Sequence, residues 1–147
     1  MQRPLLLTRV IAGCSEVFPT SAIYWGDAAV VHKPDFFRKA APPSGVNNDA
    51  PGLLWVGYLR ERHEDGSFSL YTRALSSYGC MDLEVVRTRR KPSDVLESVH
   101  DLAVYLIENG NVIRDGDTIG PDAETKIKTR YAESVIGREE KVIRVEF

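Results

Sequence analysis

The sequence lacks the features that mark several large classes of protein. It has only two cysteines, Cys14 and Cys80, and they form no C-x-x-C pair, so no disulfide framework is indicated. The leucines at positions 5–7 are followed at once by Thr8 and Arg9, and this apolar run is far too short for a signal peptide or a membrane span. We therefore expect a cytoplasmic protein with reduced thiols and no membrane partner.

An excess of positive charge is also missing. The formal net charge is −2, which gives none of the basic footprint that binding to a nucleic-acid backbone requires. Repeats and low-complexity tracts are absent, and 43% hydrophobic with 27% charged residues is close to the globular average. The 147 residues predict one domain over 1–147, with a loop rich in proline, glycine and asparagine at 41–52.

The clearest predicted element is a helix over residues 93–109. Seven apolar side chains recur there at helical spacing and form one stripe that faces a core: Val95, Leu96, Val99, Leu102, Ala103, Leu106 and Ile107. Ser93 is expected to cap the helix and Gly110 to end it. The outer face carries Glu97, Asp101 and Glu108 without a basic residue.

Alternating patterns predict strands at 22–25, 53–60, 67–74, 81–87, 112–113, 126–131 and 142–147. Residues 53–60 are apolar on both alternate sets, as in a central strand, and Asp65-Gly66 indicates a hairpin turn. Shorter helices are expected at 5–14 and 34–40. This order predicts an α+β fold, a mainly antiparallel sheet packed against one long helix (residues 93–109) and one or two shorter N-terminal helices.

The stretch NVIRDGDTIGPDAE, residues 111–124, is rich in carboxylates and glycine. An EF-hand loop starting at Asp115 would place Ile119 at its fifth position and Lys126 at its twelfth, where oxygen ligands belong. No Gly-Lys-Thr follows, so a Walker phosphate loop does not fit either. Two tight turns, at 115–116 and 120–122, are favoured, with Asp115, Asp117 and Thr118 as the candidate binding residues.

Three residues are candidates for catalysis. Cys80, in a small polar turn, becomes a nucleophile only if a base such as His63 or His100 comes near it. His100 could also be oriented as a general base by Glu97 and Asp101. An ordinary buried cysteine and surface histidines are favoured, so no catalytic residue is assigned. No H-x-x-x-H spacing occurs, and neither a metal site nor a cofactor is predicted.

Charged residues on either side of the predicted strand 81–87 raise two further possibilities. Asp82 and Glu84 could form a paired-carboxylate site, but exposed acids facing Arg73 or Arg87 across a sheet are favoured. The basic run Arg87, Arg89, Arg90 and Lys91 could meet an acidic partner surface, although a solvated loop before a helix accounts for it as well.

Several segments together resemble a known family, the bacterial domain of unknown function DUF4261. They are residues 69–75 (SLYTRAL), 78–79 (YG), 82–85 (DLEV), a following helix and 115–120 (DGDTIG). The resemblance covers roughly residues 53–135, and such proteins carry a glycine soon after the Thr-Arg pair, where Ala74 stands here. It implies a shortened member, or half of a larger fold that completes itself by self-association. It implies no activity, cofactor or catalytic residue.

These observations favour a non-enzymatic role, as a protein-binding or interaction module of the immunity or accessory type. The expected partner is another protein or a second copy of the chain, and not nucleic acid or a membrane. One alternative is a small hydrolase or metal-dependent enzyme that uses Asp115, Asp117 and Thr118 with one of Cys80, His63 or His100. The other is a structural, self-associating domain.

Overall fold

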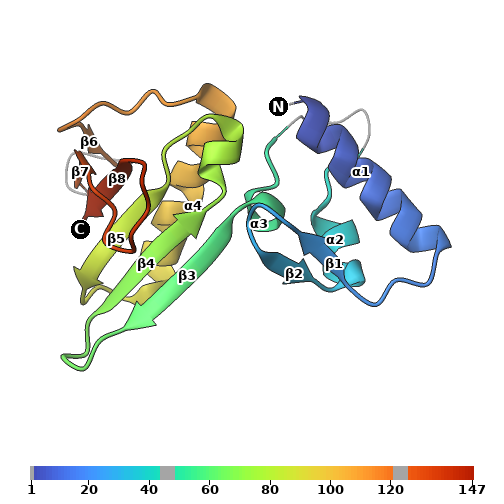
Figure 1. Cartoon of the computed structure of the whole chain (residues 1–147), viewed down its shortest axis with the longest axis horizontal. Coiled ribbons are helices and arrows are strands. Elements are labelled where there is room, and N and C mark those ends of the chain that lie inside the picture. The colour runs from blue at the N-terminus through green and yellow to red at the C-terminus, as the bar shows by residue number, and fades with distance from the viewer. Residues whose placement is uncertain (1, 44–48, 121–125) are drawn as a thin grey trace.

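The computed structural model describes residues 2–43, 49–120 and 126–147, which leaves part of the predicted loop at 41–52 outside the described residues. The elements follow in the order α1 (Gln2–Val17), β1 (Ile23–Trp25), β2 (Val30–His32), α2 (Pro34–Ala40), α3 (Gly52–Trp55), β3 (Gly57–Arg62), β4 (Phe68–Arg73), the 3-10 helix η1 (Leu75–Tyr78), β5 (Leu83–Thr88), α4 (Pro92–Asn109), β6 (Thr118–Ile119), β7 (Ile127–Ala132) and β8 (Val142–Glu146). In Figure 1 the N-terminal elements lie beside a larger sheet, with α3 between the two parts.

The larger sheet has the strand order β3-β4-β5-β8-β7-β6. Its neighbouring strands are antiparallel except β5 and β8, which are parallel. The long helix α4 lies along one face of this sheet (Figure 1), and β1 and β2 form a separate antiparallel pair. The molecule is therefore an α+β protein, as the sequence predicts, with one parallel contact inside a mainly antiparallel sheet.

The long helix confirms the predicted apolar stripe. Its buried side chains are Val95, Val99, Leu102, Ala103, Leu106 and Ile107. The helix begins one residue early because Pro92 occupies the first turn, where a missing N–H costs nothing. The predicted Ser93 cap is wrong, since Lys91 is the N-cap residue and makes no side-chain capping bond. Gly110 ends the helix with φ +80°, and its N–H donates to the Leu106 carbonyl at 2.8 Å.

The central strand predicted at 53–60 is wrong. Residues 52–55 form one helical turn, α3, which buries Leu54 and Trp55, and the chain then extends into β3 at the edge of the sheet. The residues of β3 from Leu59 onward are exposed, as expected at an edge. The apolar run 53–60 was therefore interpreted as one strand, although residues 53–55 belong to a helical turn and only those from Gly57 onward to a strand.

Other differences from the predicted elements are smaller. The first helix is longer than the predicted 5–14, and the chain forms a short strand, β2, that pairs with β1. No strand forms at 112–113, because the chain pairs with β7 only from Thr118. The remaining predicted strands and the helix 34–40 are confirmed to within two residues at each end. Within the described ranges, no helix is long and apolar enough to cross a membrane.

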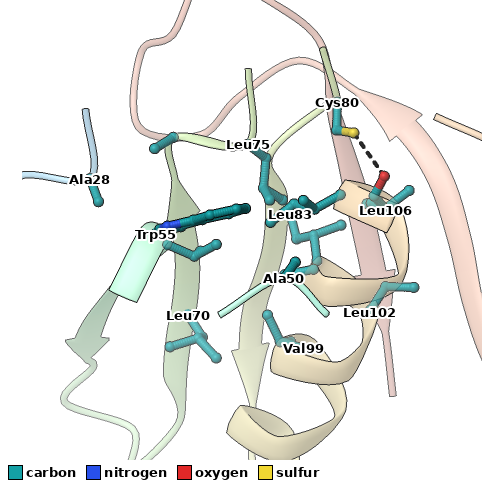
Figure 2. Packing of buried hydrophobic residues seen from close by; sticks show 14 of the residues in the cluster. Ala28, Ala50, Trp55, Leu70, Leu75, Cys80, Leu83, Val99, Leu102 and Leu106 are labelled. Atoms are coloured by element: carbon teal, nitrogen blue, oxygen red, sulfur yellow. Dashed lines mark hydrogen bonds between the residues drawn. The ribbon is translucent and has the colours of Figure 1, made fainter. Parts of the chain in front are cut away.

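Trp55 joins the N-terminal elements to the sheet. Its side chain is fully buried, and its ring stacks on Trp25 of β1 and on Tyr78 of η1, with centroids 6.4 and 5.1 Å away. Its Nε1 donates a 2.8 Å hydrogen bond to the buried Thr8 Oγ1 of α1. Figure 2 shows the indole extending toward Leu75 and Leu83 in the core. Through ring stacking and one hydrogen bond, the Trp55 side chain therefore contacts three separate segments: α1, β1 and η1.

A buried ion pair holds the parallel contact between β5 and β8. Glu84 and Arg144 are register partners on these strands, and Nη2 of Arg144 lies 3.2 Å from Oε2 of Glu84. Glu84 is fully buried and also accepts hydrogen bonds from Ser134 Oγ at 2.6 Å and the Val135 N–H at 3.1 Å. The interpretation of Glu84 as an exposed acid facing Arg73 or Arg87 is wrong, because its ionic partner lies 60 residues later in the chain.

We expect Glu84→Gln to lower the free energy of unfolding by about 3–5 kcal/mol, because it leaves the Arg144 charge buried without its counter-charge. Glu146→Gln is the matched control, since it breaks the exposed Arg130–Glu146 pair and should cost less than about 1 kcal/mol. Urea denaturation at neutral pH measures both changes. Equal, small losses of unfolding free energy in the two variants would show that the buried pair contributes no more to stability than the exposed pair.

Candidate functional site

The three candidate catalytic residues are held by different neighbours. Cys80 is buried, and its thiol donates to the Leu106 carbonyl near the end of α4, with Sγ and O 3.1 Å apart (Figure 2). His63 lies at the β3–β4 hairpin, where its Nε2 is 2.8 Å from Ser69 Oγ. His100 lies in the middle of α4. The structure therefore does not assemble Cys80 with either histidine.

The surroundings of Cys80 and His100 favour structural roles. Burial raises the pKa of the Cys80 thiol, which disfavours the reactive thiolate. Nδ1 of His100 lies 2.8 Å from Oη of Tyr58, so this contact ties α4 to β3. Burial and the nearby Asp101 charge raise the pKa of Tyr58, so its phenol keeps its proton throughout the physiological range.

The predicted turn at 115–116 is confirmed, and its carboxylates bind backbone groups. Asp115 Oδ1 accepts from the Tyr131 N–H at 2.8 Å, and Asp117 Oδ2 accepts from the Arg114 N–H at 2.7 Å. Gly116 adopts φ +84°, the left-handed conformation that glycine allows. Among the residues described, no group of three or more His, Cys, Asp or Glu is placed to hold a metal ion. The second predicted turn, at 120–122, lies partly outside them.

Asp117 and Thr118 contribute to a groove between α4 and the segment that follows it. We call this the acidic groove; it encloses about 850 Å³ and is lined by Asp94, Glu97, Ser98, Asp101, Leu102, Tyr105, Val112, Ile113, Asp117, Thr118, Ile119, Gly120 and Ile127. The structure thus brings Glu97 and Asp101 of the acidic outer face of α4 together with two of the three candidate residues of the turn, whereas Glu108 lies outside the groove. Asp115 does not line the groove.

The basic run contributes to a second cleft, of about 800 Å³, between the ends of β5 and β8. We call it the arginine cleft, after five arginines that line it: Arg87, Arg89, Arg90, Arg130 and Arg144. The first three were predicted as binding residues. Arg130 and Arg144 were not, although both fall in alternating strand patterns, because the register that pairs β7 with β8 brings them together only in the folded sheet.

A third site surrounds Asp82 at the start of β5. Its carboxylate accepts hydrogen bonds from Thr72 Oγ1 at 2.7 Å and the Leu75 N–H at 3.2 Å, and Arg138 Nη1 lies 2.8 Å from its Oδ2. Asp82 and Arg138 line a pocket of about 590 Å³. The interpretation of Asp82 as an exposed acid facing Arg73 or Arg87 is also wrong. Since Arg138 lies 56 residues beyond Asp82, no local pattern indicated the pair.

Burial raises the pKa of Asp82, and this effect exceeds the opposing ones of the Thr72 hydroxyl, the Arg138 charge and the Leu75 N–H. The folded protein therefore holds the Asp82 proton to higher pH than the unfolded chain does. As the pH rises from the ordinary aspartate pKa through the raised value, this group lowers the free energy of unfolding. Perturbed carboxylates that line pockets are candidates for function.

We expect carbon-detected NMR titration to give an Asp82 pKa above the ordinary value of about 3.9. Arg138→Gln should raise this pKa further, because it removes the nearest positive charge. Asp65 is an internal control in the same spectra, since its hydrogen bonds from Ser67 lower its pKa. An Asp82 pKa at or below the ordinary value would contradict the dominance of burial.

Comparison with known proteins finds a match to one family model. No curated protein and no solved structure matches the chain. The model of the domain of unknown function DUF4261 matches residues 71–146, just over half of the chain, from within β4 to the end of β8. The match begins later than the predicted 53–135 and extends further, so it includes both the acidic groove and the arginine cleft. The chain therefore belongs to the DUF4261 family.

Proposed function

We propose that this protein is a binding module whose acidic groove holds a segment of a partner protein that carries basic and apolar side chains. The charge of the groove is the observation that supports this most directly. Asp94, Glu97, Asp101 and Asp117 line it, and no lysine or arginine lines it within the part of the chain that the structure describes. Lys91 lies 3.6 Å from Asp94 at one end, and the other three carboxylates form no salt bridge within the described residues.

Apolar side chains give the groove its second property. Leu102, Ile113 and Ile127 are buried beneath it, whereas Tyr105 and Val112 are about half exposed, at 49% and 47%. Half-exposed apolar side chains beside a carboxylate row suit a partner that alternates apolar anchors with lysine or arginine. A small polar metabolite would leave this apolar surface in contact with water.

The edge strand β6 offers backbone groups to the same partner. Thr118 and Ile119 line the groove, and among the described strands β6 is the last of the sheet and pairs with β7 alone. An extended segment could add to this edge through main-chain hydrogen bonds, while the groove selects its side chains. The free, exposed thiol of Cys14 supports a cytoplasmic setting for this module.

The dispersed positions of Cys80, His63 and His100 favour this binding role over the hydrolase alternative. Neither Asp115 nor Asp117 has a candidate nucleophile as a hydrogen-bond partner; both accept backbone N–H groups. Both carboxylates therefore stabilise the turn through backbone hydrogen bonds, and Asp117 also lines the groove.

The double variant Glu97→Gln/Asp101→Asn tests the proposal by removing two groove charges whose side chains make no hydrogen bond within the described residues. We expect affinity-tagged wild-type protein to capture a partner protein. The double variant should bind this partner at least tenfold more weakly, because charge complementarity at the groove is lost. Glu64→Gln/Glu139→Gln is the matched control, since it removes two exposed charges outside the groove. Quantitative capture from native lysate, followed by isothermal titration with the purified partner, measures the difference. Equal loss in both double variants would contradict the proposal.

Self-association is a second candidate function, favoured by the surface of α1. Five large apolar side chains on and just after this helix are 51–76% exposed: Leu6, Leu7, Val10, Val17 and Phe18. Only Leu5, Thr8 and Ser15 of the helix are buried. Exposed apolar surface of this kind suits a second copy of the same chain. In a symmetric dimer contact, the exposed apolar side chains of α1 in each copy would cover those of the other.

If α1 is a dimer contact, the mass from light scattering rises with concentration in the wild type, and Val10→Glu abolishes the rise. Arg9→Glu on the same helix is not a suitable control, because Arg9 donates to the Pro42 carbonyl. Lys39→Glu, an exposed change on α2, is the better control and should leave the association intact. A monomer at all concentrations in the wild type would exclude this candidate.

A further inference from the structure

The arginine cleft is independent of the acidic groove and has its own structural origin. Parallel pairing between β5 and β8 is made at Leu83 with Ile143 and at Glu84 with Arg144. Beyond these pairs the two strands border the cleft through Val85, Val86, Val145 and Glu146. The cleft therefore opens at the carboxyl ends of two neighbouring parallel strands, a position where ligands commonly bind in sheets.

A β-bulge explains why β5 departs from its neighbours here. The register with β4 passes from Leu70–Val85 to Phe68–Thr88, so Val86 and Arg87 lie opposite the single residue Ser69. Arg87 adopts φ +52°, and its N–H donates to Ser69 Oγ at 3.1 Å. Bulges bend a strand and redirect side chains. In this case the bulge carries the chain from Arg87 to Arg90 along the rim of the cleft.

Three segments bring guanidinium groups to the same space. Arg87, Arg89 and Arg90 come from the end of β5, Arg130 from β7 and Arg144 from β8. Arg90 lies 5.7 Å above the ring of Phe147, and Arg130 pairs with Glu146 at 2.6 Å. Asp65 lies 3.7 Å from Arg87 and 3.9 Å from Arg89. Among the described residues, the five arginines are accompanied by three side-chain carboxylates: Glu146 in the lining, Glu84 beside Arg144 and Asp65 at the rim, so positive charges still outnumber negative ones.

One of these arginines is buried with an unused donor. The side chain of Arg144 is 10% exposed; its Nη2 binds Glu84 and the Glu133 carbonyl, but its Nε has no hydrogen-bond partner within the described residues. A buried N–H without an acceptor is rare in folded proteins and needs an explanation, such as a bound water or ion. Because Arg144 lines the cleft, an anion bound there would lie beside its guanidinium, and a small shift of this side chain would let its Nε–H donate to the anion.

We propose that the arginine cleft binds an oxyanion of the phosphoryl class that carries at least two negative charges. Guanidinium groups bind phosphate oxygens through paired, charge-assisted hydrogen bonds. Arginines that converge from three segments suit a tetrahedral group with oxygens in several directions better than a planar carboxylate. The cleft volume of about 800 Å³ exceeds that of a single phosphate, so the bound group is part of a larger small molecule, such as a diphosphate.

Isothermal titration of the full chain with inorganic pyrophosphate at 0.15 M NaCl tests the site. We expect saturable binding that weakens at least tenfold in Arg130→Gln and in Arg144→Lys, which keeps the charge but removes the Nε–H. Arg60→Gln removes an exposed arginine outside the cleft and should leave the affinity within about threefold. Glu146→Gln should strengthen binding severalfold, because it removes the carboxylate that holds Arg130. If Arg144→Lys does not fold, Arg130→Gln and Arg90→Gln carry the test.

ADP and citrate distinguish the sources of the anion. Tighter binding of ADP than of pyrophosphate would support a nucleoside diphosphate, and the reverse would support a free polyphosphate. Citrate bound as tightly as pyrophosphate would overturn the phosphoryl class. Absence of saturable binding, or equal weakening in Arg60→Gln and Arg130→Gln, would overturn the site itself.

Discussion

The buried pair of Glu84 and Arg144 is the interaction on which the sheet depends. Strands β5 and β8 are parallel neighbours far apart in the sequence, and their pairing spans only two residue pairs. A carboxylate and a guanidinium buried at one of those pairs penalise any slip in register, because a slip would leave both charges without a partner. Ser134 and Val135, in the loop before β8, donate hydrogen bonds to the same Glu84 carboxylate. The pair therefore fixes the strand and its preceding loop together.

Both proposed binding surfaces follow from this arrangement. Because β5 and β8 pair over so short a length, their carboxyl ends frame a cleft, and Arg144 is at once the structural partner of Glu84 and a lining residue of that cleft. On the other side of β8, β7 and β6 complete the sheet beside α4, and the acidic groove lies between that helix and the β6 segment. Surfaces of opposite charge thus occupy separate places on one small sheet.

Local patterns in the sequence predicted much of the fold. The apolar stripe of α4, the hairpin turn at Asp65-Gly66 and the turn at Asp115-Gly116 each depend on residues within one or two turns of chain. Non-local contacts could not be predicted in this way. Glu84 was interpreted as exposed because nothing within its own strand indicates Arg144, and residues 53–60 were interpreted as one strand because apolar residues of a helical turn and an edge strand lie end to end.

The residues of the candidate sites likewise divide into those that local sequence patterns indicate and those that only the fold brings together. Arg87, Arg89 and Arg90 stand out in the sequence because they are adjacent, whereas Arg130 and Arg144 join them only through the order of strands in the sheet. The acidic face of α4 was visible from helical spacing, but its position beside Asp117 depends on how the chain returns after Gly110. Residue types and local spacing therefore indicate charge, and the topology decides which charges share a surface.

A double-mutant cycle on Glu84→Gln and Arg144→Met tests the central claim, that these two side chains act as one unit at the parallel contact. We expect each single variant to be strongly destabilised and the double variant to lose much less than the sum, with a coupling free energy of at least about 2 kcal/mol, at the upper end for residues in direct contact. Losses that add to within about 0.5 kcal/mol would contradict the account, because they would show that each side chain stabilises the sheet independently of the other.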